Sequence, residues 1–466
     1  MLKLCMRYHT SDKPKKTLES KYSITEGTIW KALLVFFFPI LVGTLFQQLY
    51  NTIDAVIIGK SEGKEALAAV GGGTAVYLTL LIGFFVGISS GSTVVISQLI
   101  GAKRPRATSR AVHTSLSLAF VGGIIMTLIG IASSGYVLKL MDTPEEITAL
   151  SREYLHIYFF SMVPMFIYNM VSGILRAAGD SRTPLYTLIA AVITNIILDL
   201  LFVVFFKWGV AGVAWATVLS QAESMIISLI ILKNRTDSIR FYFSHIEFCL
   251  PLLAKMLRIG FPTGVQSTFY GVSNIIIQSA INSFGTITIA AWASYSKLDG
   301  IFWTVVSAMG VALTTFAGQN YGAGKYERIK QSMWQALGMT ALFTIFAMGV
   351  FLAMGVHSFF LFTSDIQVAE EGFYMLKFLS PLWITYISIE VLSGVIRGAG
   401  DAFKPMIISL FGICLLRIVW LFGAVPMNHT ITTVMASYPI TWTVTSIMYW
   451  IYYTRGNWLR RIHKEK

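Results

Sequence analysis

The sequence contains few charged residues for its length. Asp, Glu, Lys and Arg make up 13% of its 466 residues, whereas 55% are hydrophobic, and only 12 are proline. A soluble domain of this size does not need so apolar a composition. The balance excludes an ordinary soluble protein and indicates a chain that crosses a membrane several times, with the lipid bilayer as its main partner.

The chain also lacks the motifs of common enzymes and metal sites. Its cysteines, Cys5, Cys249 and Cys414, lie far apart, with no C-x-x-C and no histidine cluster beside them, so neither a disulfide framework nor a metal site is predicted. The sequence has no G-x-x-x-x-G-K-[ST] loop, no H-E-x-x-H and no G-x-S-x-G. Direct ATP hydrolysis is therefore excluded, and no cofactor is expected.

Basic residues exceed acidic ones, giving a net charge of +13. In a soluble chain this excess would suggest nucleic acid, but here the basic residues occupy short segments between apolar runs. That distribution fixes the orientation of membrane helices. We therefore expect no nucleic-acid partner.

Apolar runs of about 20 residues, the length that crosses a bilayer, predict an all-α integral membrane protein with twelve transmembrane helices. They cover residues 29–58, 70–100, 111–138, 153–175, 185–206, 210–232, 252–283, 287–317, 332–356, 373–396, 406–425 and 430–453. Most Lys and Arg between them lie on the side of the N-terminus. By the positive-inside rule both termini are expected in the cytoplasm, and the protein in the cell (inner) membrane.

A short motif occurs twice and indicates a duplication. Ser172 to Pro184, SGILRAAGDSRTP, returns 221 positions later as Ser393 to Pro405, SGVIRGAGDAFKP. Each copy predicts a hairpin between two helices, in which Gly ends the first helix, and Asp or Ser/Thr caps the second. Gln98 with Gly101-Ala102 also returns as Gln319 with Gly322-Ala323, and Phe38-Pro39 returns as Phe261-Pro262.

The duplication predicts two six-helix bundles related by a pseudo-twofold axis along the membrane normal, with a cavity between them. The expected division is a cytoplasmic tail at 1–28, a first bundle at 29–232, a cytoplasmic linker at 233–251, a second bundle at 252–453 and a cytoplasmic tail at 454–466. Gly71-Gly72-Gly73 and the stretch from Gly87 to Gly91 would allow either close packing or flexing of the second span, and close packing is the preferred interpretation.

Polar residues within the first-half spans are candidates for function, because charged groups in the bilayer are costly. Asn195 and Asp199 lie four residues apart on one helix face, and Gln47, Asn51 and Asp54 share a face of the first span. With Thr217 of the sixth span, such faces would form a pocket of oxygen atoms suited to Na⁺ or to a proton. Alternatively, these groups only hydrogen-bond neighbouring helices together.

The second half keeps the repeat but loses these carboxylates, since Asp54 corresponds to Ile277 and Asp199 to Trp420. It has a polar set of its own. Gln266, Tyr270, Asn274 and Gln278 follow one another at i+4 spacing and should face the cavity. Lys297, Asp299, Glu390 and Arg417 carry two charges of each sign, so they either neutralise one another in a buried network or serve substrate binding or a second proton relay.

Several of these stretches together resemble the multidrug and toxic compound extrusion (MATE) family. The resemblance rests on the repeated R-x-x-G-D hairpins, on AGQNYGAG at Ala317 to Gly324 and on NTIDAVIIG at Asn51 to Gly59. It implies a V-shaped pair of six-helix bundles that exports organic cations and other amphiphilic small molecules in exchange for H⁺ or Na⁺. It also implies a cation-coupling site at Asp54, Asn195, Asp199 and Thr217, where the first three could hold Na⁺.

The same resemblance separates two branches of the family. In the second-half acidic positions of the NorM-like branch this chain has Tyr270 and a residue near Tyr386, which favours the DinF-like branch. We expect alternating access in a monomer. One alternative is a lipid-linked oligosaccharide flippase of the same superfamily, which would want several basic residues in its cavity, although only Lys297 and Arg417 are available. Another is a polytopic membrane enzyme, which would need a His, Asp or Glu cluster that the sequence lacks.

Overall fold

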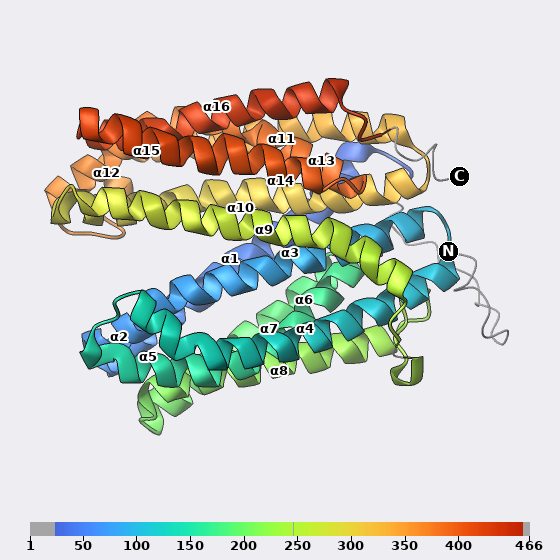
Figure 1. Cartoon of the computed structure of the whole chain (residues 1–466), viewed down its shortest axis with the longest axis horizontal. Coiled ribbons are helices and arrows are strands. Elements are labelled where there is room, and N and C mark those ends of the chain that lie inside the picture. Colours follow the sequence, from blue (N-terminus) through green and yellow to red (C-terminus); the bar gives the residue numbers. More distant parts are fainter. Residues whose placement is uncertain (1–23, 246, 460–466) are drawn as a thin grey trace. The chain divides into compact units, whose positions relative to one another are not determined.

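The computed structural model describes residues 24–245 and 247–459, and in these ranges the chain folds into helices without any strand (Figure 1). The predicted all-α class is confirmed. Most of the predicted tails, including Cys5, lies outside the described residues.

The first half of the chain contributes eight α-helices and two short helices of other types. They are α1 (Ile29–Ser61), α2 (Gly63–Gly71), α3 (Gly73–Gly101), α4 (Pro105–Leu140), α5 (Glu145–Tyr158), the 3₁₀-helix η2 (Phe159–Ser161), α6 (Met162–Ala177), α7 (Arg182–Asp199), the π-helix η3 (Leu200–Phe205) and α8 (Gly209–Lys233). The 3₁₀-helix η4 (Phe243–His245) lies in the connection that follows.

The second half begins with α9 and also contains a π-helical segment, although not at the position that the repeat offset of 221 would give. Its elements are α9 (Leu250–Asn282), α10 (Thr286–Gly322), α11 (Tyr326–Met354), η5 (Gly355–Ser358), α12 (Ile366–Leu379), η6 (Ser380–Trp383), α13 (Ile384–Gly398), α14 (Phe403–Ser409), the π-helix η7 (Leu410–Leu415), α15 (Leu416–Met427) and α16 (Ile431–Arg455).

Ten helical segments of the described chain are long and apolar enough to cross a membrane. Two further helices, α9 with 33 residues and α16 with 25, are long enough but more polar. Together they account for the twelve predicted spans. Several segments extend beyond the predicted bounds, as with Glu145–Ala177 against 153–175, because a helix continues past the residues that are apolar enough to be counted.

The described chain packs as two compact units, unit 1 containing Phe38–Gly264 and unit 2 containing Thr25–Phe37 and Val265 onward. The division falls inside two helices and not in the connection between the halves. It lies next to Pro39 in α1 and near Pro262 in α9. The first turns of each half's first helix thus belong to the unit built mainly by the other half.

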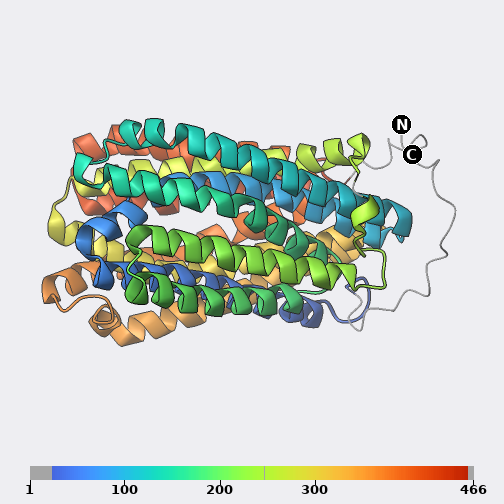
Figure 2. The same cartoon turned by 90° about the horizontal axis from the view of Figure 1, so that it is seen from below.

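In unit 1, α6 packs against α3 and α4, and α7 packs along α8, the pair drawn in green in Figure 2. Glycines let α3 approach the first part of α9 closely. A Cβ atom on Gly87 would lie 2.3 Å from the nitrogen of Gly264, and one on Gly91 would lie 2.3 Å from the carbonyl oxygen of Met256. These glycines therefore serve helix packing, as predicted.

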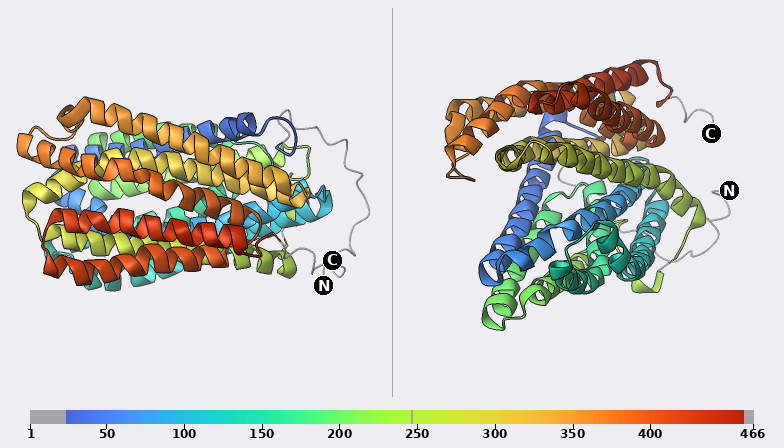
Figure 3. Two further views of the ribbon diagram at one scale, coloured as in Figure 1. Left: turned by 90° about the horizontal axis from the view of Figure 1, so that it is seen from above. Right: turned by 60° about the vertical axis from the view of Figure 1, so that its left-hand side comes forward.

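Unit 2 is organised around α10, which contacts α11, α12 and α13, while α13 also packs on α16 (Figure 3). Here too a glycine is required at a crossing. A Cβ atom on Gly398 of α13 would lie 2.6 Å from the carbonyl oxygen of Thr314 in α10. The two helices meet backbone to backbone at this point.

The repeated motif folds as the sequence predicts. Gly179 and Gly400 adopt φ of 96° and 99°, which favours glycine. Each is followed by an N–H that returns to the preceding helix, from Asp180 to the Leu175 oxygen at 2.9 Å, for example. The Asp180 carboxylate then accepts from the N–H of Thr183 at 3.0 Å and so caps α7.

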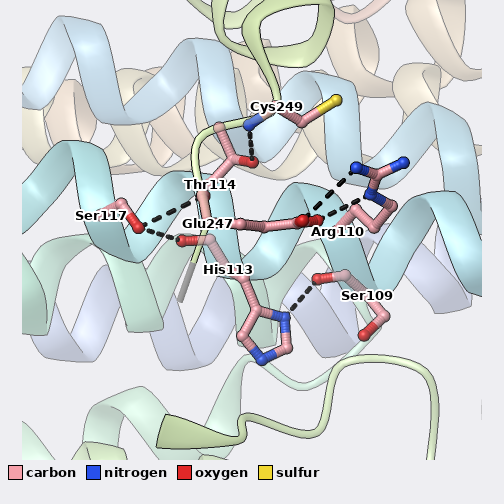
Figure 4. Close-up of polar contacts among 7 residues, drawn as sticks. All are labelled: Ser109, Arg110, His113, Thr114, Ser117, Glu247 and Cys249. Atoms are coloured by element: carbon pink, nitrogen blue, oxygen red, sulfur yellow. Dashed lines mark hydrogen bonds and ion pairs between the residues drawn. The ribbon is translucent and has the colours of Figure 1, made fainter. Parts of the chain in front are cut away.

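The connection between the halves is docked on α4, as Figure 4 shows for part of it. Arg110 pairs with Glu247 at 2.7 Å. His113 Nε2 accepts from the N–H of Tyr242 at 3.1 Å, while its Nδ1 lies 2.7 Å from the Ser109 oxygen. These contacts tie the segment ahead of α9 to unit 1.

The segment ahead of α1 is held in the same manner in unit 2. Lys325 donates to the Thr25 oxygen at 2.8 Å, and Arg328 donates to the Gly27 oxygen at 2.9 Å. Both basic residues follow the second copy of the Gln-x-x-Gly-Ala motif. In each unit, residues that follow the Gln-x-x-Gly-Ala motif therefore hold the segment that precedes a long helix, α9 in unit 1 and α1 in unit 2.

Candidate functional site

Two buried carboxyl groups meet inside unit 1. Asp54 lies in α1 and is 8% exposed, whereas Asp199 ends α7 and is fully buried. The π-helix η3 starts directly after Asp199, a local irregularity that often occurs at functional sites. The carboxyl groups lie within hydrogen-bonding reach of one another, although 145 residues separate them in the sequence.

The amide of Asn195 bridges the two carboxyl groups. With its nitrogen turned toward them, it donates to Asp54 Oδ1 at 2.9 Å and to Asp199 Oδ2 at 3.3 Å. Asp199 Oδ1 is buried and has no hydrogen-bond partner among the described residues. In the same part of the chain, no Lys or Arg forms an ion pair with either carboxylate.

Tyrosine side chains surround this group. Tyr50 of α1 donates to Thr217 of α8 at 3.0 Å, and both residues are buried. Tyr154 and Tyr158 of α5 lie within electrostatic range of Asp54. Thr217 is therefore linked to the carboxylate group indirectly, by its hydrogen bond with Tyr50, which lies near Asp54. Within the described ranges, Thr217 forms no hydrogen bond with either Asp.

The other two predicted members of the α1 stripe differ in environment from Asp54. Gln47 is half-buried and Asn51 is exposed. The structure therefore brings together Asp54, Asn195 and Asp199, with Thr217 as an outer neighbour, and leaves Gln47 and Asn51 outside this group.

The polar stripe of α9 divides into an anchored part and an exposed part. Gln266 donates to Tyr270 at 3.1 Å and to Ser409 of α14 at 2.9 Å. Asn274 and Gln278 are exposed. Within the described ranges, therefore, the first part of the stripe alone is hydrogen-bonded to another helix of unit 2.

The four charged residues predicted in the second half do not neutralise one another, so that interpretation is wrong. Asp299 of α10 accepts from Trp303 Nε1 at 2.6 Å and from the Tyr295 hydroxyl at 3.1 Å. Glu390 of α13 lies 3.6 Å from Arg397 of the same helix. Lys297 is exposed. Asp299, Glu390 and Lys297 therefore have different surroundings, and none of them forms an ion pair with another of the four.

Arg417 of α15 is the most isolated of the four. It is 4% exposed, it donates to the Thr441 hydroxyl at 3.3 Å, and its guanidinium lies 4.3 Å from the ring centre of Tyr438. Its Nε has no partner, and no acidic side chain lies within ion-pair distance, among the described residues. It is a buried cation for which the described part of the chain supplies no counter-anion.

The profile of the MatE family matches residues 39–201 and again residues 262–422, which is most of both halves. The chain belongs to the MatE family. It is therefore a multi-pass membrane transporter of the kind associated with multidrug efflux, and it is not an enzyme. The two matched segments also correspond to the two copies of the sequence repeat.

Relatives and solved structures agree with this MatE membership. The probable multidrug resistance protein YoeA of Bacillus subtilis is 28% identical over 460 residues, covering 95% of this chain and 96% of its own. The multidrug export protein MepA of Staphylococcus aureus is 21% identical over 411 residues, covering 87% and 90%.

Among solved structures, a MOP superfamily transporter from Pyrococcus furiosus superposes with a TM-score of 0.88 at 21% identity, covering 96% of this chain and 100% of its own. An outward-facing MATE family transporter gives 0.87 at the same identity and coverage. These likenesses establish that the chain has the MatE fold.

Sequence reasoning missed the tyrosines around the unit 1 carboxylates and the pairing of Glu390 with Arg397. For the tyrosines one signal was present, because Tyr50 precedes Asp54 by four residues and therefore lies on the same face of α1. The ion pair gave a weaker signal. Arg397 lies seven residues, about two helical turns, beyond Glu390 in α13, so the two share a helix face without being neighbours at i+3 or i+4 spacing.

Proposed function

We propose that this MatE protein exports amphiphilic organic cations in exchange for H⁺ or Na⁺, and that Asp54, Asn195 and Asp199 bind the coupling ion. The observation that carries the proposal is the pair of buried carboxyl groups bridged by one amide, without a basic partner among the described residues. Two negative charges in such a place repel each other and lose their hydration. A bound proton or Na⁺ relieves both costs.

The orientation of Asn195 separates the two candidate ions. With its amide nitrogen turned toward the carboxyl groups, the orientation that gives both hydrogen bonds, the side chain suits a shared proton. Na⁺ requires oxygen ligands, so the amide would have to turn and present its oxygen. Asp199 Oδ1, which lacks a partner in the described part of the chain, is the atom best placed to receive either ion.

Ion binding would act on the packing of unit 1. Asp54 belongs to α1 and Asp199 to α7, so neutralising their charges removes a repulsion between these helices. An ion shifts a conformational equilibrium only by its different affinities for the two states. Exchange therefore requires the ion and the exported cation to favour opposite states.

The test uses inverted membrane vesicles containing buffer alone. A proton gradient or a Na⁺ gradient is imposed separately, and uptake of a fluorescent organic cation is followed. Wild type should show uptake under one of the gradients, and Asp199→Asn should lose it. Asp142→Asn is the matched control, because Asp142 is exposed in the turn after α4.

Each outcome separates the alternatives. Uptake that survives in Asp199→Asn would refute the coupling site and direct attention to Glu390 and Asp299. If neither gradient drives uptake of any organic cation into wild-type vesicles, the lipid-linked oligosaccharide flippase becomes the better interpretation.

A further inference from the structure

Unit 2 carries the opposite charge at the place that corresponds to the coupling site. At the repeat offset of 221, Ile196 corresponds to Arg417, Asp199 to Trp420 and Thr217 to Tyr438. The turn of α7 that holds the first-half carboxylate thus corresponds to the turn of α15 that holds a buried guanidinium.

The contacts of Arg417 leave part of its charge and hydrogen-bonding capacity unused. Thr441 supplies one hydroxyl and Tyr438 one ring face, both electrically neutral. Nε donates to no atom of the described residues. A guanidinium has five donors in a planar fork that matches a carboxylate, and burying it without an anion is costly. An anionic group is the chemistry that would complete these contacts.

Aromatic rings line the surroundings of this guanidinium. The Tyr438 ring lies 5.4 Å from that of Trp442 and 5.9 Å from that of Trp292, and Trp303 lies 6.1 Å from Trp442. Tyr438 and Trp303 are half-exposed, whereas Trp442 is buried. The half-exposed rings offer a planar hydrophobic group a face on which to stack.

A carboxylate borders the same rings. Asp299 is half-buried and accepts from Trp303, and both Asp299 and Arg417 lie within electrostatic range of Tyr438. Because the two charges are not paired with each other, each remains able to attract an opposite charge. An ammonium group near aromatic faces and a carboxylate is a favourable arrangement.

We propose that unit 2 binds aromatic zwitterions, with the anionic carboxylate of the ligand at Arg417 and its ammonium group at Asp299. This inference rests on the proposed export function and narrows its substrate class. Tyr438 covers the guanidinium and would have to turn aside to admit the carboxylate. A ligand with the cation alone lacks the interaction with Arg417.

The test compares two probes that differ in one group. They are 3-(2-naphthyl)alanine, which is a zwitterion, and its methyl ester, which keeps the ring and the ammonium group but not the carboxylate. Binding to the purified full-length protein is measured by fluorescence. Wild type should bind the zwitterion about ten- to hundredfold more tightly than the ester, as expected for hydrogen bonds to a charged group.

Variants assign the preference to Arg417. Arg417→Gln should bind both probes alike while its affinity for the ester stays that of wild type, which also shows that the variant is folded. Arg417→Lys should keep part of the preference, because it retains the charge but not the fork. Arg152→Gln, at an exposed position of α5, is the control and should behave as wild type.

Equal binding of the two probes by wild type, no measurable binding of the zwitterion, or a preference that survives in Arg417→Gln would each overturn the proposal. Failure of the export function is recognised separately, by the absence of gradient-driven uptake of the ester into vesicles.

Discussion

Asn195 shows how a neutral side chain determines the behaviour of two charged ones. Its amide supplies the hydrogen bonds that Asp54 and Asp199 receive at 2.9 and 3.3 Å. Removing the amide leaves two buried carboxyl groups without this donor, and an unmet buried hydrogen bond costs about 1–3 kcal/mol. The residue therefore influences ion affinity without carrying charge.

Asn195→Leu keeps the approximate volume of the side chain and removes the amide. If Na⁺ is the coupling ion, an oxygen ligand is lost, and Na⁺-driven uptake should fall by about tenfold or more. If H⁺ is the coupling ion, uptake should persist at a reduced rate. Uptake in vesicles, measured against Na⁺ concentration at constant pH, distinguishes the two cases.

The control for this experiment is Asn234→Leu, since Asn234 is exposed directly after α8. Wild-type ion dependence in Asn195→Leu would contradict a role for the amide in the site.

At this scale the sequence revealed the site in part. The four-residue spacing of Asn195 and Asp199 placed them on one face, because a helix repeats every 3.6 residues. Their meeting with Asp54 followed from family resemblance, since spacing within one helix does not show which neighbouring helix it faces. The interpretation of Lys297, Asp299, Glu390 and Arg417 as one neutralising network, one of the two alternatives, failed for the same reason.

At the scale of elements, glycines determine how closely the helices approach. Gly91 leaves no room for a side chain between α3 and α9, because a Cβ atom there would also lie 2.5 Å from the nitrogen of Gly260. Both obstacles are backbone atoms, which cannot rotate away. The glycine at this crossing is required by the packing and not by its own backbone conformation.

Gly91→Ala should therefore destabilise the protein by about 1–3 kcal/mol, the usual effect of overpacking. A lower midpoint of thermal unfolding in detergent would show it. Gly135→Ala is the control, since Gly135 of α4 has no atom within 4 Å of the added Cβ and alanine favours a helix. Equal midpoints for the two variants would refute the packing role of Gly91.

The transmembrane helices were well predicted, because the backbone N–H and C=O groups of a long apolar run in the bilayer must be hydrogen-bonded within a helix. The structure added the short helices α2, α5 and α12, which precede or extend spans. Their residues are too polar for a hydropathy count, as the Glu145 and Glu146 pair at the start of α5 illustrates.

At the scale of the whole molecule, the distribution of basic residues predicts that both termini lie in the cytoplasm. The turn after α4, with Asp142, should then face outward, and the start of α4, with Arg106, should face inward. Asp142→Cys, in a background with Cys5→Ser, should react with a membrane-impermeant maleimide in intact cells. Arg106→Cys should react only after the cells are permeabilised.

Cys249 and Cys414 are buried and should not react under either condition, so they need not be replaced in the background. Labelling of Arg106→Cys in intact cells, with none of Asp142→Cys, would reverse the assigned orientation.

The first turns of α1 and of α9 each belong to the unit built mainly by the other half, and this arrangement has a consequence for the duplication. The first turns of α1 complete unit 2, and the first turns of α9 complete unit 1. A protein made of one repeat alone would have to obtain this segment from a second copy, as domain-swapped homodimers do. In this chain the duplication supplies both exchanged segments within one polypeptide.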